Sequence, residues 1–103
     1  MIIVNTPTIE GKKIETLGLV SGSTVQSKNA FKDIGAGFRN MVGGEIVSYT
    51  KMLCEARDIA TERMVKQAKS MNADAIVNVR FSSASVMEGA AEILAWGTAV
   101  KFV

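Results

Sequence analysis

The sequence has no histidine, one cysteine and one proline among its 103 residues, and aromatic residues make up only 6%. Without histidine a Ser-His-Asp triad cannot form, and the thiol of Cys54 has no imidazole to act as its base. A single cysteine also forms no internal disulfide and no paired-cysteine zinc motif. We therefore expect Cys54 to serve in packing or at an interface, and it is the one thiol candidate for a metal ligand.

Long hydrophobic runs and blocks of one charge are missing as well. No apolar run approaches the roughly 18 residues of a membrane span, and the first residues lack the basic segment and long apolar core of a signal peptide. The 12 basic and 10 acidic residues are mixed along the chain, whereas a dedicated nucleic-acid surface clusters its lysines and arginines. We expect a cytoplasmic protein with no membrane span and no nucleic-acid partner.

What the sequence does contain is a high share of hydrophobic residues, 48%, in a chain long enough for one core. This share is high for a small soluble monomer and favours a homo-oligomer. No linker, repeat or low-complexity segment divides the chain, so we expect a single domain over residues 1–103.

The longest pattern is an amphipathic helix over residues 45–72. No glycine or proline interrupts it, and its apolar positions recur at the helical period. With Leu53 as the reference, one face is apolar and the opposite face is charged. The apolar arc is wider than a helix on a single sheet needs, which suggests contact with a second body. The face holds Ile46, Tyr49, Leu53, Ala60, Met64, Ala68 and Met71, with Met52, Ile59, Cys54 and Val65 on its shoulders.

Shorter segments surround this helix. Runs of β-branched and apolar residues predict two strands before it and two after it. A segment with apolar residues at helical spacing, interrupted by two glycines, is interpreted as a short helix. The order strand, strand, helix, helix, strand, strand indicates an α+β domain with a largely antiparallel sheet packed on the long helix. The expected strands cover residues 1–5, 14–20, 75–87 and 92–103, and the short helix covers 29–42.

The last strand has two apolar faces. One carries large residues and the other is small and apolar until Lys101, whereas an exposed strand face normally carries charged or long polar groups. Small residues allow close approach of a barrel interior or of a neighbouring chain. One chain has few elements to cover so many faces, so we expect self-association. The large face holds Leu94, Trp96, Thr98, Val100 and Phe102, and the small face holds Ile93, Ala95, Gly97 and Ala99.

Two glycines before the long helix, Gly43 and Gly44, suggest a contact for an anion. A helix start offers unpaired N–H groups and the positive end of the helix dipole, although the glycines also simply make the turn. Arg57 lies about 40° from the centre of the apolar arc, where its guanidinium needs an acceptor. A structural ion pair would satisfy it, and so would a bound anion. With Arg39, these residues form the candidate site of an anion- or nucleotide-binding protein.

Several motifs, in this order and spacing, resemble those of one family. Together they make nearly the whole chain similar to the YbjQ family of small bacterial proteins, which carries the label "putative heavy-metal-binding". The motifs are TPTIEG at 6–11, AGFRNMVGG at 36–44, Tyr49, EAR at 55–57, NADAIV at 72–77 and GTAV at 97–100.

The resemblance implies a dodecin-subunit-like α+β chain that assembles into a ring, a pentamer, with its strands forming a central barrel. It implies a metal as the nominal ligand, and it adds Tyr49 to the candidate ligand residues. This sequence departs from the family at Arg80, where the family has an acidic residue. A metal site that depended on this acid is lost here.

The leading hypothesis is a non-enzymatic, homo-oligomeric protein that binds a small ligand, with a heavy metal as the family's suggestion. The alternative is an anion- or nucleotide-binding protein, which leaves room for enzymatic activity. A third interpretation is an interaction scaffold or membrane-peripheral protein that uses the basic segment around Phe31 and Phe38.

Overall fold

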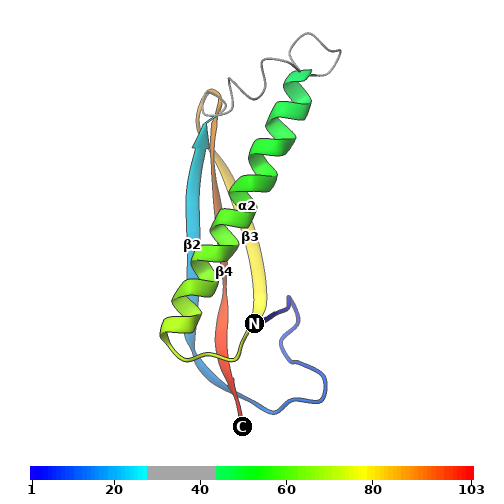
Figure 1. Ribbon diagram of the computed structural model, residues 1–103, viewed down its shortest axis with the longest axis vertical. Helices are drawn as coiled ribbons and strands as arrows, with labels where there is room; N and C mark the ends of the chain where they lie inside the picture. The colour runs from blue at the N-terminus through cyan, green and yellow to red at the C-terminus, as the bar shows by residue number, and fades with distance from the viewer. Residues whose placement is uncertain (28–43) are drawn as a thin grey trace.

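The computed structural model describes residues 1–27 and 44–103 (Figure 1). One long helix lies across a single sheet, so the predicted α+β class is confirmed. The short helix predicted over residues 29–42 lies outside the described residues. The elements are β1 (Ile2–Ile3), β2 (Ile14–Ser27), α2 (Gly44–Ser70), β3 (Ala75–Met87) and β4 (Ala90–Phe102).

The sheet has four strands in the order β1-β3-β4-β2. β4 lies inside it and pairs antiparallel with both β2 and β3, while the short β1 pairs parallel with β3. The sheet is therefore mixed, and within the described residues it is open rather than closed into a barrel. A closed barrel with a filled interior takes about eight strands, so the predicted barrel is not formed by one chain and stays a prediction about an assembly.

α2 begins and ends within two residues of its predicted bounds. Its end is fixed by Asn72, whose backbone is left-handed with a φ of 61°. The Asn72 amide donates to the Lys69 carbonyl at 3.0 Å, and the Ala73 amide donates to the Ala68 carbonyl at 3.1 Å. These bonds satisfy carbonyls of the last turn and lead the chain directly into β3. No helix in the described part of the chain has the length and apolar composition of a membrane span.

The buried residues of α2 recur at every fourth position. Because four residues turn a helix by about 400°, this stripe rotates by about 40° at each step. The helix runs obliquely across the strands (Figure 1), so the face in contact with the sheet changes along its length. Leu53, the predicted centre of the face, is therefore 38% exposed, whereas Met52 is fully buried. The buried stripe consists of Met52, Ala56, Ala60, Met64 and Ala68.

The helix and the sheet pack closely because small residues lie between them. Gly22 of β2 faces α2, and a Cβ added there would collide with the Ala60 carbonyl oxygen and the Met64 amide nitrogen. The small face of β4 also points at α2. The prediction that this face meets a barrel interior or a neighbouring chain is wrong, because the helix of the same chain covers it. The residues of this face are all buried: Ile93, Ala95, Gly97 and Ala99.

Among the described residues, the opposite face of the sheet, which we call the far face, is covered at one end only. Residues from the N-terminal segment pack there against buried residues of β3 and β4. Farther along this face Leu19 is 72% exposed and Val25 is 56% exposed, so the cover ends before them. The small cluster under the cover contains Ala75, Val77 and Val100, packed against Val4, Ile9, Ile14 and Phe102.

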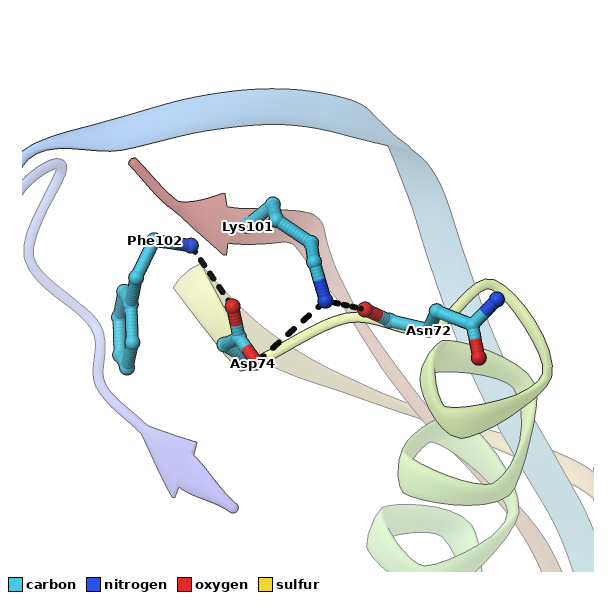
Figure 2. Close-up of polar contacts among 4 residues, drawn as sticks. All are labelled: Asn72, Asp74, Lys101 and Phe102. Atoms are coloured by element: carbon cyan, nitrogen blue, oxygen red, sulfur yellow. Dashed lines mark hydrogen bonds and ion pairs between the residues drawn. The ribbon is translucent and has the colours of Figure 1, made fainter.

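A polar clip joins the turn after α2 to the end of β4 (Figure 2). Asp74 accepts a hydrogen bond from the Phe102 amide through Oδ2 at 2.8 Å, and its Oδ1 atom lies 3.7 Å from the Lys101 ammonium. Lys101 Nζ also donates to the Asn72 carbonyl at 2.9 Å. These contacts hold the exit of the helix against the last strand, so we interpret the clip as structural.

Candidate functional site

Of the predicted ligand residues, those that the structure describes all lie on α2. Arg39 and Gly43 lie outside the described residues, and Gly44 is the first residue of α2. Tyr49 is half-buried and Arg57 is exposed. A helix rises about 1.5 Å per residue, so Gly44 and Arg57 are separated by about 20 Å along its axis. One small anion cannot contact both ends of that span, so binding at the helix start and binding at Arg57 are two separate predictions.

Arg57 lies on the surface of α2 rather than inside the apolar arc predicted for it. It follows the buried Ala56, and one residue turns a helix by about 100°, away from the buried stripe. Its Nη2 atom donates to Sγ of Cys54 at 3.5 Å, and both side chains are exposed. From the sequence we expected the Arg57 guanidinium to need an acceptor. One acceptor is the Cys54 thiol, one turn earlier on the same helix.

The donor groups in the described residues do not form a metal centre. Nowhere in the described part of the chain do three or more histidine, cysteine, aspartate or glutamate side chains gather where they could hold a metal ion. Cys54 is the only thiol of the sequence. The positive guanidinium of Arg57 beside its sulfur disfavours a bound cation. The described residues of one chain therefore do not fit a heavy-metal site.

β2 is the edge strand on one side of the sheet, and side chains of α2 protect this edge. The Ser21 amide donates to Oε1 of Gln67 at 2.8 Å, and Nη1 of Arg63 donates to the Ser23 carbonyl at 2.6 Å. These bonds occupy backbone groups that an additional strand would need, and natural sheets block their edges by such means. We call residues 21–23 the guarded β2 edge.

On the other side of the sheet, the chain around β1 protects only the first half of β3. The Val4 amide donates to the Ile76 carbonyl and the Val4 carbonyl accepts from the Val79 amide, both at 3.0 Å. Nη1 of Arg80 donates to the Asn5 carbonyl at 2.9 Å. The chain that follows β1 thus covers β3 as far as Arg80.

The second half of β3, residues 81–87, is exposed at every position. Phe81 is 47% exposed, Val86 51% and Met87 67%. α2 packs mainly on β2 and β4, so the helix leaves this half of β3 uncovered. In the described residues β1 is the one strand beside β3 opposite β4, and it pairs only with Ala75 and Ile76. We call residues 81–87 the free β3 edge.

Sequence reasoning predicted this strand but not its exposure. The run Ser82-Ser83-Ala84-Ser85 lacks the apolar alternation of a half-buried strand. That missing alternation was the available signal.

Comparisons with known proteins find similar sequences along the whole length of the chain. Residues 1–103 match the family model YbjQ_1, described as "Putative heavy-metal-binding". The chain is similar to UPF0145 proteins from Clostridium novyi, at 54% identity, and Alkaliphilus metalliredigens, at 57%, over 100% of each chain. A UPF0145 protein from Methanosarcina acetivorans is 59% identical over 100% of this chain and 98% of its own.

A solved structure is similar to this chain in fold. It is a protein of unknown function of the DUF74 family from Pediococcus pentosaceus, with a TM-score of 0.62 and 13% identity. The match covers 100% of this chain and 98% of the other. At this identity it supports the architecture alone.

Proposed function

The chain belongs to the YbjQ family, and from this premise we propose that it is a homo-oligomeric binding protein without enzymatic activity. The observation that carries the proposal is the surface that one chain leaves uncovered. A helix on one face of an open sheet makes only two layers, and most of the far face has no third layer in the described residues.

One chain exposes more surface than its mass requires. Its accessible surface is 6588 Å², whereas a folded monomer of 11.0 kDa exposes about 5,600 Å². Its radius of gyration is 16.7 Å, against about 13 Å for a compact domain of this length.

Most of the large exposed apolar side chains of the described strands lie along the two edges of the sheet. Contact between two different surfaces of identical copies produces a ring when the rotation closes. We therefore propose a ring, with five copies as the family resemblance implies. Strands of several copies would build a barrel in it. We also propose a cytoplasmic location. One edge exposes Ile2, Ile3, Phe81, Val86 and Met87, and the other exposes Leu17, Leu19 and Val25.

The ligand we propose is a small molecule or a metal ion held between copies. The family description names heavy metals, but the described residues of one chain do not fit such a site. A metal site in this protein therefore needs donors from more than one copy. Cys54 is exposed, so an assembly can bring it next to donors of another copy.

The experiment is native mass spectrometry of protein purified without added metal. We expect a single oligomer at an integer multiple of 11.0 kDa, and a retained ligand would add a reproducible extra mass. A spectrum that contains only the monomer at micromolar concentration would contradict the proposal. An oligomer without extra mass would support the assembly and remove the support for a resident metal.

A further inference from the structure

We propose that residues 4–13, which join β1 to β2, form a strap that opens and closes over one end of the far face, with the guanidinium of Arg80 as its latch. The strap runs outside the sheet and starts beside the first residues of β3 (Figure 1). β1 moves with it, since only Ile2 and Ile3 pair with β3. The movement takes place within one chain, so the inference goes beyond the function proposed above.

The strap buries few side chains. All of its side chains are exposed except those of Val4 and Ile9, which are half-buried. These two pack on the small cluster of the far face, Ala75, Val77 and Val100. A segment with few buried apolar contacts opens at a lower free energy than the core of a fold. We therefore expect the strap to open while the rest of the chain stays folded.

The backbone of the strap meets the sheet at a bulge in β3. The register of β3 against β4 shifts just before Arg80, and Asn78 in this bulge has a left-handed φ of 54°. In a regular strand successive N–H groups point to opposite sides. Here the amides of Asn78 and Val79 both donate to the strap, to the Thr6 carbonyl at 2.9 Å and the Val4 carbonyl at 3.0 Å. The bulge thus turns two consecutive donors toward the strap.

Arg80 adds the side-chain bond that holds the strap to β3. Its Nη1 atom donates to the Asn5 carbonyl of the strap at 2.9 Å and to the Val79 carbonyl at 3.0 Å. A hydrogen bond from a charged donor is roughly twice as strong as one between neutral groups. Arg80 is exposed, so water replaces the bond when the strap leaves. This side chain therefore favours the closed strap without preventing its release.

The other end of the strap remains attached and serves as a hinge. The Lys13 carbonyl accepts from the Val103 amide at 3.0 Å. Just before it, the Lys12 amide donates to the Ile9 carbonyl at 3.1 Å, which closes a turn that contains Gly11 with a φ of 77°. No described atom lies within 4 Å of a Cβ added to Gly11, so the turn has room to move.

The long strands do not depend on the strap. β2, β4 and β3 pair with one another along their length, and α2 packs mainly on β2 and β4. An open strap uncovers the small cluster, which then adds to the apolar surface that Leu19 already exposes on the same face. The strap therefore controls how much of the far face is available for binding.

The first test measures amide hydrogen exchange of the wild-type protein with residue resolution. The amides of Val4, Asn78 and Val79 bond across the contact between the strap and β3. Those of Ile93 and Ala95 lie on the interior strand β4. We expect the first group to exchange at least about 10-fold faster, because opening of the strap alone releases it. Equal rates in the two groups would overturn the inference, since the strap would then open only with the whole fold.

The second test compares Arg80→Met with Arg63→Met. Methionine keeps an apolar side chain and has no donor. We expect Arg80→Met to raise the exchange rates of the strap contacts about 3- to 10-fold, the value of one hydrogen bond, and to leave β4 unchanged. Arg63 is the matched control: it is also exposed and its Nη1 atom donates to a backbone carbonyl, that of Ser23, at 2.6 Å. No change in Arg80→Met, or an equal change in Arg63→Met, would overturn the latch.

The third test measures access to the covered cluster. Val100 is 1% exposed, so a thiol placed there by Val100→Cys, in a Cys54→Ser background, reacts with a thiol reagent only when the strap is open. We expect Arg80→Met to raise this labelling rate by the same factor as the exchange rates. A labelling rate that Arg80→Met leaves unchanged would overturn the control of access by the strap. If Val100→Cys fails to fold, the exchange measurements still decide whether the strap opens.

Discussion

At the scale of single residues, the packing of α2 on the sheet depends on Gly22. The atoms that an added Cβ would meet belong to the helix backbone at Ala60 and Met64, so they move only if the whole helix moves. We expect Gly22→Ala to lower the free energy of unfolding by about 1–3 kcal/mol, the usual cost of overpacking. Urea denaturation measures it. Ser23→Ala on the same strand is the control, since that side chain is exposed, and an equal loss there would contradict the explanation.

The clip at Asp74 allows a second comparison of single residues. Asp74 accepts from the Phe102 amide and is about one-third exposed, while Lys101 is 45% exposed. Asp74→Ala leaves a half-buried amide without its acceptor, so we expect a loss of about 1–2 kcal/mol. Lys101→Ala removes an exposed ion pair, which we expect to cost less than about 1 kcal/mol. Denaturant midpoints of the two variants give the order, and the reverse order would contradict the role of the clip.

At the scale of elements, α2 is held on the sheet by the buried stripe that rotates around it. Met64 is fully buried and Leu53 is 38% exposed. We expect Met64→Ala to cost about 2–5 kcal/mol, because it combines lost burial with a cavity. Leu53→Ala removes a side chain that is only partly buried, and we expect about half that loss. Chemical denaturation at one protein concentration compares them, and a larger loss at Leu53 would restore the face predicted from the sequence.

The same elements show how far sequence reasoning reaches here. Periodicity predicted α2 and the three long strands because their apolar patterns are local, but β1 spans only Ile2–Ile3 and β2 continues to Ser27, past its predicted end at residue 20. It misjudged the face of α2 because a fixed rotation of 100° per residue ignores the oblique crossing of the sheet. It also assigned the small face of β4 to another chain, since a pattern cannot tell which helix will cover it. The distance between Gly44 and Arg57 was predictable from the sequence, because a single predicted helix joins these two residues.

At the scale of the whole molecule, we expect metal binding to depend on more than one copy of the chain. One chain has a single thiol and no histidine, so a soft metal needs donors from several copies to be held tightly. We expect titration with Cd²⁺ by calorimetry to saturate below one ion per chain, and Cys54→Ser to remove that binding. Tight binding of one ion per chain, retained in Cys54→Ser, would show a site that the described residues do not contain.

We propose that the open sheet of one chain is completed by other copies. Small-angle X-ray scattering tests it most directly, since one experiment gives both mass and radius of gyration. We expect a mass that is a multiple of 11.0 kDa and a radius of gyration above the 16.7 Å of a single chain. A mass of 11.0 kDa with a radius near 16.7 Å, unchanged up to high concentration, would contradict it.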